Sequence, residues 1–329
     1  MNRFVVVGAG SIAKRHIRNL KLKFPQAEVV CVSSSGRGIS QDETAADVIE
    51  PNLISAINKM PDAAIIASPA PWHIENALEF LRAGIPVLIE KPFAHRFDAI
   101  EPVMATLLEF RDKIEVGYNL RYTTAARKMK EVLEQGKCGR LLCALVDVGQ
   151  YLPDWRRNED YRKNVSAKSN LGGGVLLELS HELDYLKWFL GPVSSVYCDA
   201  GASGTLEIDV EDRIDAVLRM VDGCVVNLHM DFLQRVPSRV CKIVGENGTL
   251  IWNVYENSVQ WHSAAEGIEV IYADTSYDRN AAYLEEIDQL CKIVRNECKP
   301  FISVSEGIET VELIDKMRVS SNCGIVVKW

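Results

Sequence analysis

Short apolar runs alternate with stretches of helical spacing in the first third of the chain. The apolar runs lie at residues 4–7, 29–32, 63–67, 87–89 and 114–117, and the helical spacing lies at 12–24, 74–83 and 99–110. Short, fully apolar strands that alternate with helices are typical of βαβ units, whose parallel sheet is covered on both faces. This part is therefore predicted to be an α/β domain with a doubly wound parallel sheet.

The pattern changes after about residue 120. A helix is predicted near 123–135, and the strand candidates that follow are longer, at 141–148, 214–220, 224–232, 240–244 and 249–252. The dipeptides Asp222-Gly223 and Asn247-Gly248 each separate two of these runs, as tight hairpin turns do. The chain is thus predicted to hold two domains, 1–121 and 122–329. The second is an α+β domain with a mixed, largely antiparallel open sheet.

Composition and charge narrow the class of protein. The 329 residues are 47% hydrophobic and 25% charged with a net charge of −8, so no basic footprint for nucleic acid is expected. No apolar stretch reaches about 18 residues and the N-terminus enters a strand at once, so neither a membrane span nor a signal peptide is expected. The nine cysteines include no C-x-x-C, and they fit buried free thiols in a reducing cytoplasm better than a disulfide framework.

A glycine-rich turn follows the first predicted strand. Residues 8–13 read G-x-G-x-x-A between a strand and a helix. Gly8 permits a tight turn, Gly10 lets backbone approach a pyrophosphate, and Ala13 keeps helix and strand close. The helix N-terminus offers free N–H groups to phosphates. The turn predicts a Rossmann domain that binds a dinucleotide through Gly8, Gly10, Ser11 and Ile12; a turn without a ligand is the alternative.

The end of the second predicted strand bears on which dinucleotide binds. An NAD enzyme usually places Asp or Glu about 20 residues after the glycines, where it holds the ribose 2′-hydroxyl. Here the chain reads Ser33-Ser34-Ser35-Gly36-Arg37, which offers hydroxyl donors and a cation suited to a 2′-phosphate. Ser33, Ser34 and Arg37 therefore favour NADP over NAD, unless Arg37 is a solvated loop charge.

Several motifs together resemble one enzyme family. Besides G-A-G-S-I-A they are Ala67-Ser68-Pro69 with His73 shortly after, Glu90-Lys91-Pro92, residues 117–122 and residues 172–184. The set is similar to the glucose–fructose oxidoreductase/inositol dehydrogenase (Gfo/Idh/MocA) family over essentially the whole chain. The resemblance implies NAD(P)-dependent hydride transfer to or from a C–OH or C=O group of a sugar, nucleotide sugar or polyol. It also implies a homodimer or homotetramer formed through the second sheet, and cofactor contacts from Ser68, Pro69, His73, Glu90 and Asn119.

The apolar run at 85–89 ends abruptly in Glu90-Lys91-Pro92. Open α/β sheets bind their ligands at the carboxyl ends of the strands, so a side chain placed there faces a binding site. By the resemblance, Lys91 hydrogen-bonds the reacting hydroxyl and stabilises the developing alkoxide. A solvent-exposed lysine at a strand end is the alternative.

A second candidate site lies in residues 172–191. Leucines at 176, 179, 183, 186 and 190 have helical spacing and predict one buried stripe, with His181 roughly opposite its centre and Glu178 and Asp184 flanking it. A solvated helix face is the alternative. An H-E-x-x-H zinc motif fails, because Tyr185 stands four residues after His181, and no metal is expected.

The resemblance makes His181 the residue that takes the hydroxyl proton as hydride leaves carbon. An imidazole titrates near neutral pH, which suits this work. The segment departs from the family pattern in one respect, because it has one residue fewer between the glycines and the histidine. Glu178 stands three residues before His181, where the family has Asp four before, so Glu178 is the candidate for that third catalytic role with a different geometry.

Aromatic and charged residues follow the first predicted strand of the second domain, in Y-L-P-D-W-R-R at 151–157. Aromatic rings stack on sugar faces and arginine binds carboxylate or phosphate. An ordinary surface loop with ion pairs is an equal alternative. Together with residues 180–184 this segment resembles family members of surface-sugar or nonulosonic acid biosynthesis. The residues expected to contact substrate are Arg121, Tyr122, Asp154, Trp155, Arg156 and Asp184.

Two other functions stay open. One is a glycosidase that holds NAD tightly and uses a transient oxidation, which would show no net cofactor turnover. The other is a non-catalytic, dinucleotide-sensing protein. The presence of both Lys91 and His181 favours the oxidoreductase over the sensor, because a sensor needs neither.

Overall fold

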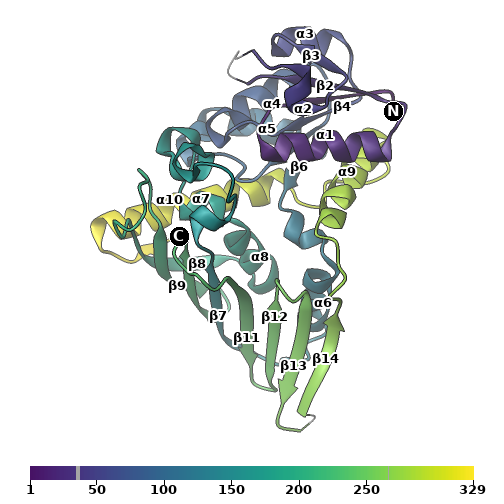
Figure 1. Cartoon of the computed structure of the whole chain (residues 1–329). Coiled ribbons are helices and arrows are strands. Elements are labelled where there is room, and N and C mark those ends of the chain that lie inside the picture. Colours follow the sequence, from purple (N-terminus) through teal and green to yellow (C-terminus); the bar gives the residue numbers. More distant parts are fainter. Residues whose placement is uncertain (35–37, 266) are drawn as a thin grey trace. The chain divides into compact units, whose positions relative to one another are not determined.

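The computed structural model describes residues 1–34, 38–265 and 267–329, which form two compact units (Figure 1). Unit 1 comprises Met1–Asn119 and Arg279–Glu312, and unit 2 comprises Leu120–Asp278 and Leu313–Trp329. The chain first passes from unit 1 to unit 2 between Asn119 and Leu120, close to the predicted boundary at 121/122. The return of residues 279–312 to unit 1 differs from the predicted division.

Helix α9 (Asn280–Val294) explains this return. Its apolar residues Ile287, Leu290 and Cys291 are buried in the same hydrophobic cluster as Phe4 and Val6 of the first strand. Burying such side chains stabilises the fold by about 1.5–3 kcal/mol each. A helix late in the sequence therefore completes the core of unit 1.

The sheet of unit 1 has six parallel strands in the order β3-β2-β1-β4-β5-β6, which confirms the predicted doubly wound parallel sheet. The residues of β4 are all fully buried, as expected for a strand covered on both faces. Strand β3 is short and was not predicted. The strands are β1 (Arg3–Val7), β2 (Glu28–Val32), β3 (Val48–Glu50), β4 (Ala63–Ile66), β5 (Val87–Glu90) and β6 (Ile114–Gly117).

The helices predicted at 12–24 and 74–83 are present, whereas the one predicted at 99–110 is broken, and the other helices of unit 1 were not predicted. In the broken segment the chain forms 3₁₀ turns at Phe97–Ala99 and Glu101–Val103, and helix α5 begins only at Met104. Pro102 accounts for the break, because it has no N–H and its ring blocks a continuous helix. Besides α9 and the first part of α10 (Val304–Cys323), the helices are α1 (Ser11–Lys23), α2 (Gln41–Thr44), α3 (Leu53–Asn58), α4 (His73–Arg82) and α5 (Met104–Glu109).

The sheet of unit 2 has nine strands in the order β14-β13-β12-β11-β7-β10-β9-β8-β15. Among the described residues of this sheet only β7 and β10 pair in parallel, so the predicted largely antiparallel sheet is confirmed. Asp222-Gly223 and Asn247-Gly248 join antiparallel neighbours, as predicted. The strands are β7 (Leu141–Gly149), β8 (Val193–Gly201), β9 (Arg213–Met220), β10 (Val225–Asp231), β11 (Ser238–Gly245), β12 (Thr249–Asn253), β13 (Ser258–Ser263), β14 (Gly267–Ala273) and β15 (Val327–Lys328).

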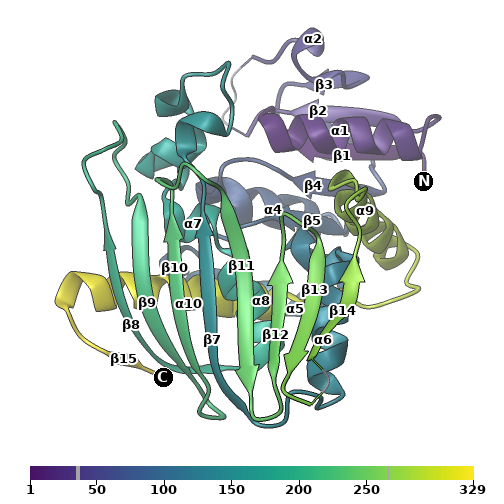
Figure 2. The ribbon, with the colours of Figure 1, turned by 60° about the horizontal axis from the view of Figure 1, so that its bottom comes forward.

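Helices cover one face of this sheet, and Figure 2 shows α6 (Thr124–Glu134) and α8 (His181–Leu190) behind its strands. The helical spacing predicted from Leu176 to Leu190 is divided between two helices, because α7 (Val175–Glu178) ends before α8 begins. The leucine stripe is buried, as predicted. His181 is also buried, so the alternative of a solvated helix face is wrong.

All nine cysteines are free, which agrees with the predicted absence of a disulfide framework. Six are buried and only Cys323 is exposed. A reducing, cytoplasmic location stays a prediction. Among the described residues, no helix is both long and apolar enough to cross a membrane.

Candidate active site

The glycine turn joins β1 to α1. Gly8 has a φ of 117°, and a Cβ added there would lie 2.5 Å from the carbonyl oxygen of Ala67, so only glycine fits. Gly10 is the N-cap residue of α1, and a Cβ added to it would meet nothing within 4 Å. Ser11 and Ile12 form the first turn of this 13-residue helix. The turn thus offers open backbone N–H groups at a helix N-terminus, which fits a dinucleotide pyrophosphate.

The other predicted cofactor residues lie along one edge of the same sheet. The strands are parallel, so their carboxyl ends share that edge, where open α/β sheets bind ligands. Ser33 and Ser34 directly follow β2 and are half-buried, whereas Arg37 lies outside the described residues. The edge therefore carries, after successive strands, Gly8, Ser33, Ser68, Lys91 and Asn119.

His73 ties two of these strand ends together. Its Nδ1 lies 2.9 Å from the carbonyl oxygen of Pro92, and its Nε2 lies 2.6 Å from that of Ser68. Burial lowers the pKa of His73, and the two carbonyl groups oppose this shift only in part. Because both ring nitrogens face the backbone, the placement favours a supporting role for His73 over the direct cofactor contact expected from the sequence. Ser68 is fixed further by Asn76, whose Nδ2 donates to its Oγ at 3.1 Å, and Pro69 starts the next turn.

Glu90 and Lys91 stand where β5 ends. Glu90 is buried, and its Oε1 lies 2.5 Å from Nε2 of His16 on α1. Its Oε2 accepts a hydrogen bond from the backbone N–H of Lys91 at 3.2 Å. Lys91 itself is half-buried at the carboxyl edge of the sheet. The carboxylate thus points into unit 1, and the ammonium group belongs to the edge where a ligand would bind.

Sequence reasoning missed His16 and its neighbours on α9, Tyr283 and Glu286. His16 lies on the same buried stripe of α1 as Ala13, Ile17 and Leu20, so a polar residue in an apolar stripe was an available signal. The two residues of α9 gave no such signal, because nothing in the sequence assigned that helix to unit 1.

His181 is the first residue of α8 in unit 2 and is 9% exposed. The acidic residues that follow it are each held by an arginine. Arg239 donates to both carboxyl oxygens of Glu182 at 2.7 and 3.0 Å, and Arg121 donates to both of Asp184 at 2.8 and 2.7 Å. These ion pairs hold the first turn of α8 from two positions, which orders the backbone that carries His181.

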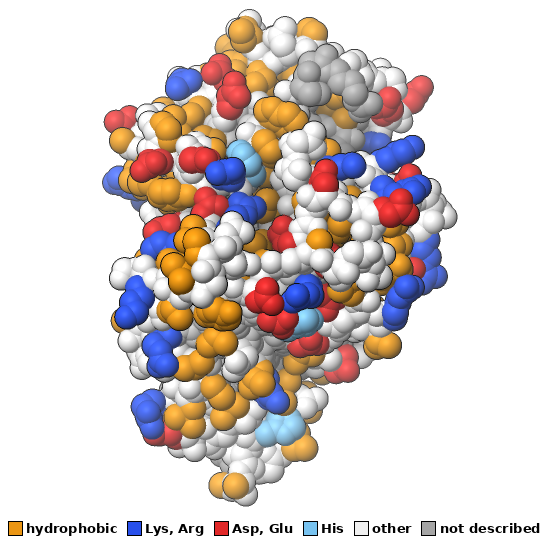
Figure 3. All heavy atoms as spheres, turned by 90° about the vertical axis from the view of Figure 1, so that its left-hand side faces the viewer, with side chains coloured by type: hydrophobic (Ala, Val, Ile, Leu, Met, Phe, Trp, Pro, Cys, Tyr) orange, Lys and Arg blue, Asp and Glu red, His pale blue; other side chains and the backbone are white. Residues whose placement is uncertain are grey.

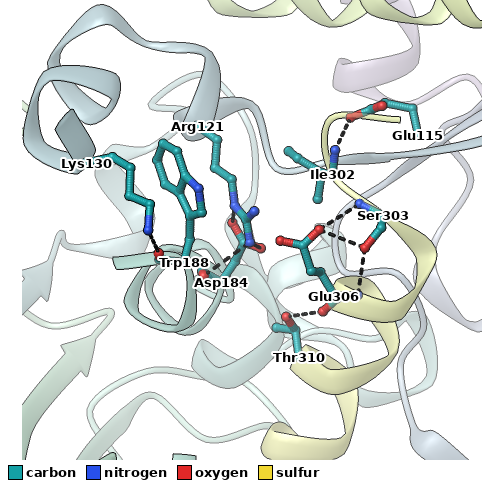
Figure 4. Close-up of polar contacts among 9 residues, drawn as sticks. All are labelled: Glu115, Arg121, Lys130, Asp184, Trp188, Ile302, Ser303, Glu306 and Thr310. Atoms are coloured by element: carbon teal, nitrogen blue, oxygen red, sulfur yellow. Dashed lines mark hydrogen bonds and ion pairs between the residues drawn. The ribbon is translucent and has the colours of Figure 1, made fainter. Parts of the chain in front are cut away.

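Figure 4 shows the Arg121–Asp184 pair beside Trp188, whose ring centroid lies 5.2 Å from the guanidinium carbon. Both members of the pair are about 1% exposed. Tyr122 is also buried, with the Arg127 guanidinium 5.6 Å from its ring centroid. This placement favours a structural role for Arg121, Asp184 and Tyr122 over the substrate contact expected from the sequence.

The segment after β7 is also more structural than expected. The ring of Trp155 packs edge-on against Phe232 with centroids 5.2 Å apart, and its Nε1 donates to the carbonyl oxygen of Gln150 at 3.1 Å. Asp154 is exposed and lies 3.7 Å from Arg157, while Arg156 is half-buried. The geometry supports the alternative of a surface loop with ion pairs, at least for Asp154 and Trp155.

Glu178 is the last residue of α7 and is half-buried. It does not share a continuous helix with His181, because the chain leaves helical geometry at Leu179, whose φ and ψ are −101° and 27°. The expected polar helix face of Glu178, His181 and Asp184 therefore does not form as one helix face.

Comparisons with known proteins cover both units. Residues 2–118 match a family model described as an oxidoreductase family with an NAD-binding Rossmann fold. Residues 126–251 match a model described as the GFO/IDH/MocA C-terminal domain. The two matches together span more than half of the chain.

Named relatives and solved structures agree with these matches. Inositol 2-dehydrogenase 3 of Saccharopolyspora erythraea is 30% identical over 75% of this chain and 72% of its own. The 1,5-anhydro-D-fructose reductase of Ensifer adhaerens is 26% identical over 76% of this chain and 75% of its own. The WlbA dehydrogenase of Bordetella pertussis, solved with NADH and UDP-GlcNAcA, is 24% identical and has a TM-score of 0.79. The match covers 100% of this chain and 98% of the WlbA chain. A levoglucosan dehydrogenase with NADH and L-sorbose has a TM-score of 0.87 at 16% identity, with 100% and 98% coverage.

Proposed function

The chain belongs to the Gfo/Idh/MocA family of oxidoreductases with an NAD-binding Rossmann fold, and we propose that it transfers a hydride to or from a sugar, nucleotide sugar or polyol. The observation that carries the proposal is the open glycine turn at Gly8 and Gly10 on the same sheet edge as Lys91. The names of the relatives, which act on inositol and anhydrofructose, support the substrate class. So does the UDP-GlcNAcA in the WlbA structure.

The proposed roles combine the placement of the residues of unit 1 with the family resemblance, which supplies the roles of His181 and Glu178. A bound nicotinamide dinucleotide would supply the hydride acceptor or donor. The backbone N–H groups at Gly10, Ser11 and Ile12 would hold its pyrophosphate. Lys91 would hydrogen-bond the reacting oxygen and stabilise negative charge as it develops there. His181 would take or return the hydroxyl proton, with Glu178 as the candidate third catalytic residue.

Lys91→Ala tests the proposal most simply. Turnover should fall at least about 100-fold, because one stabilising donor at a developing oxyanion is worth that much. The dissociation constant for the dinucleotide should change less than about two-fold, because the pyrophosphate is bound elsewhere on the edge. Lys21→Ala, which removes an exposed lysine paired with Asp47 in the same unit, is the control and should leave both quantities unchanged. Full turnover in Lys91→Ala would sink the catalytic assignment.

NADP rather than NAD is the proposed cofactor, on the strength of Ser33, Ser34 and Arg37. The half-buried serines follow β2 as this role requires, and no acidic residue stands at residues 33–37 to hold a 2′-hydroxyl. The NADH in the WlbA and levoglucosan dehydrogenase structures points the other way for those proteins. Arg37→Ala should raise the dissociation constant for NADPH about ten-fold and leave that for NADH unchanged; equal effects on both would reject the preference.

A homodimer or homotetramer formed through the sheet of unit 2 is the proposed assembly. In Figure 2 no helix of the described residues covers the near face of this sheet. Figure 3, which shows the left-hand side of Figure 1, has hydrophobic side chains exposed among charged ones on that side. Leu145, Val217 and Tyr197 lie in one row across paired strands and are 41%, 43% and 44% exposed. Val217→Asp should reduce the sedimenting mass, whereas Val236→Asp, at an 80% exposed site between strands, should not. A wild-type protein that sediments as a monomer would reject this assembly.

Net cofactor turnover separates the proposed function from its rivals. An oxidoreductase consumes one equivalent of dinucleotide for each product, whereas a glycosidase with a transient oxidation returns it. A dinucleotide sensor would bind the cofactor and show no reaction with any sugar. Measuring nicotinamide absorbance alongside product decides among the three.

A further inference from the structure

A carboxyl group without a hydrogen-bond partner lies in the interior of unit 1. Glu286 on α9 is fully buried, and neither of its carboxyl oxygens has a partner among the described residues. Burying an unpaired charge is costly, so such a group takes the neutral form. Burial raises the pKa of Glu286 well above its usual value, and the carboxyl groups of Glu90 and Glu115 raise it further. Glu286 therefore favours its neutral, protonated form.

Glu90 has a different environment from Glu286. Its Oε1 faces Nε2 of His16 at 2.5 Å and its Oε2 accepts the N–H of Lys91. His16 is fully buried, and its Nδ1 has no hydrogen-bond partner among the described residues. An imidazolium would leave a buried N–H at Nδ1 without an acceptor, so the neutral ring with its proton on Nε2 fits best. Glu90 is then a carboxylate whose charge His16 does not cancel.

Other titratable groups lie around Glu90 and His16. Tyr283 packs edge-on against His16 at 5.9 Å, and burial, together with the charge of Glu90, raises the pKa of Tyr283 to about 12. Arg15 lies on the face of the Tyr283 ring, 4.6 Å from its centroid. Glu115 accepts the backbone N–H groups of residues 301 and 302, the second of which is drawn in Figure 4. Lys91 is the remaining charged neighbour along the chain.

We propose that Glu90, as a carboxylate facing a neutral His16, strengthens binding of the oxidised, positively charged nicotinamide relative to the reduced, neutral one. The inference rests on the proposed function, because it takes the nicotinamide to bind at the end of β5, next to Glu90 and Lys91. A buried carboxylate acts on a nearby cation with little screening, so its charge is felt more strongly than that of a surface group.

The test compares the dissociation constants for oxidised and reduced dinucleotide by isothermal titration calorimetry at pH 7. It uses NAD⁺ and NADH, or the phosphorylated pair if that binds more tightly. Glu90→Gln should raise the ratio of the oxidised to the reduced constant about ten-fold, which corresponds to about 1.4 kcal/mol. Glu286→Gln should leave the ratio within about two-fold, because it replaces a group that is already neutral. Glu285→Gln, a half-buried neighbour on the same helix, is the control and should behave like the wild type.

His16→Gln supplies an independent readout if Glu90→Gln does not fold. A glutamine keeps an N–H donor for Glu90, so a neutral His16 predicts an unchanged ratio of the dissociation constants for oxidised and reduced dinucleotide. If His16 were a cation, its replacement should tighten the relative binding of the oxidised form about ten-fold, and that result would overturn the proposal. An unchanged ratio in a folded Glu90→Gln, or a shift in Glu286→Gln as large as in Glu90→Gln, would also overturn it. Absence of binding of either dinucleotide to the wild type would instead reject the proposed function.

Discussion

Truncating Asp184 to alanine should destabilise unit 2 by about 3–5 kcal/mol, the cost of removing one member of a buried ion pair. Arg121 and Asp184 have side chains that are each 2% exposed, and two N–H groups of Arg121 meet the two carboxyl oxygens at 2.8 and 2.7 Å. Once the carboxylate is removed, the guanidinium stays in a place that water cannot reach. The cost comes from this unsolvated cation more than from the attraction that is lost.

The double variant Arg121→Met/Asp184→Leu measures the contribution of the whole ion pair to the free energy of unfolding, apart from the cost of removing one member. Replacing both charges by apolar groups of similar size leaves no buried charge, so stability should return to within about 2 kcal/mol of the wild type. Glu131→Ala is the control, because its pair with Lys128 is exposed at 43% and 50%, and it should cost less than about 1 kcal/mol. The dissociation constant for dinucleotide should be unchanged in all variants, since the glycine turn belongs to unit 1.

Urea unfolding followed by tryptophan fluorescence provides the assay. Five of the six tryptophans lie in unit 2, so the signal reports mainly on that unit. A loss below about 1 kcal/mol in Asp184→Ala would show that the guanidinium is solvated and refute the structural reading. Arg121 and Asp184 would then again be candidates for substrate contact.

Three further predictions follow from the geometry of single residues. Gly10→Ala should fold normally but raise the dissociation constant for the dinucleotide about ten-fold or more. Gly8→Ala should instead unfold at a lower urea concentration than the wild type, because the added Cβ would meet a carbonyl oxygen at 2.5 Å. Equilibrium titration and urea unfolding distinguish the two. His229 has a pKa raised from 6.5 to about 9, chiefly by its hydrogen bond to Asp231. The stability that protonated His229 contributes is therefore complete below pH 6.5 and is lost as the pH rises through about 9. His229→Gln should lower the free energy of unfolding by up to about 1 kcal/mol at pH 6 and leave it unchanged at about pH 10. Urea unfolding at the two pH values measures this difference. Cys323 should be the only thiol that a water-soluble disulfide reagent labels rapidly in the native protein, since it is the one exposed cysteine.

Most of the fold could be predicted because local pattern and tertiary environment agree. The five strands expected in the first third are all present, since a fully apolar run of four or five residues leaves few alternatives to a buried strand. The hairpins at Asp222-Gly223 and Asn247-Gly248 followed from turn chemistry alone. The helix expected at 99–110 was wrong in its first half, because helical spacing outweighed the Pro102 that interrupts it.

The candidate site could be predicted less completely, because its parts come together through contacts that are distant in sequence. Lys91 was expected at a strand end and lies there. The partner of Glu90 is His16, 74 positions away, and no local pattern connects them. Helical angles counted across residues 172–190 failed because the chain breaks at Leu179. Arg121 and Asp184, expected at the substrate, form a buried ion pair, and burial of this kind is not visible in sequence.

A fluorescence titration of the wild-type protein with NADPH and NADH shows whether the chain binds a nicotinamide dinucleotide, on which the proposed function depends. The proposed function predicts saturable binding of one dinucleotide per chain, tighter for NADPH, with a dissociation constant about ten-fold or more higher in Gly10→Ala. Absence of saturable binding for both dinucleotides would contradict the assignment of the chain as a nicotinamide-dependent oxidoreductase.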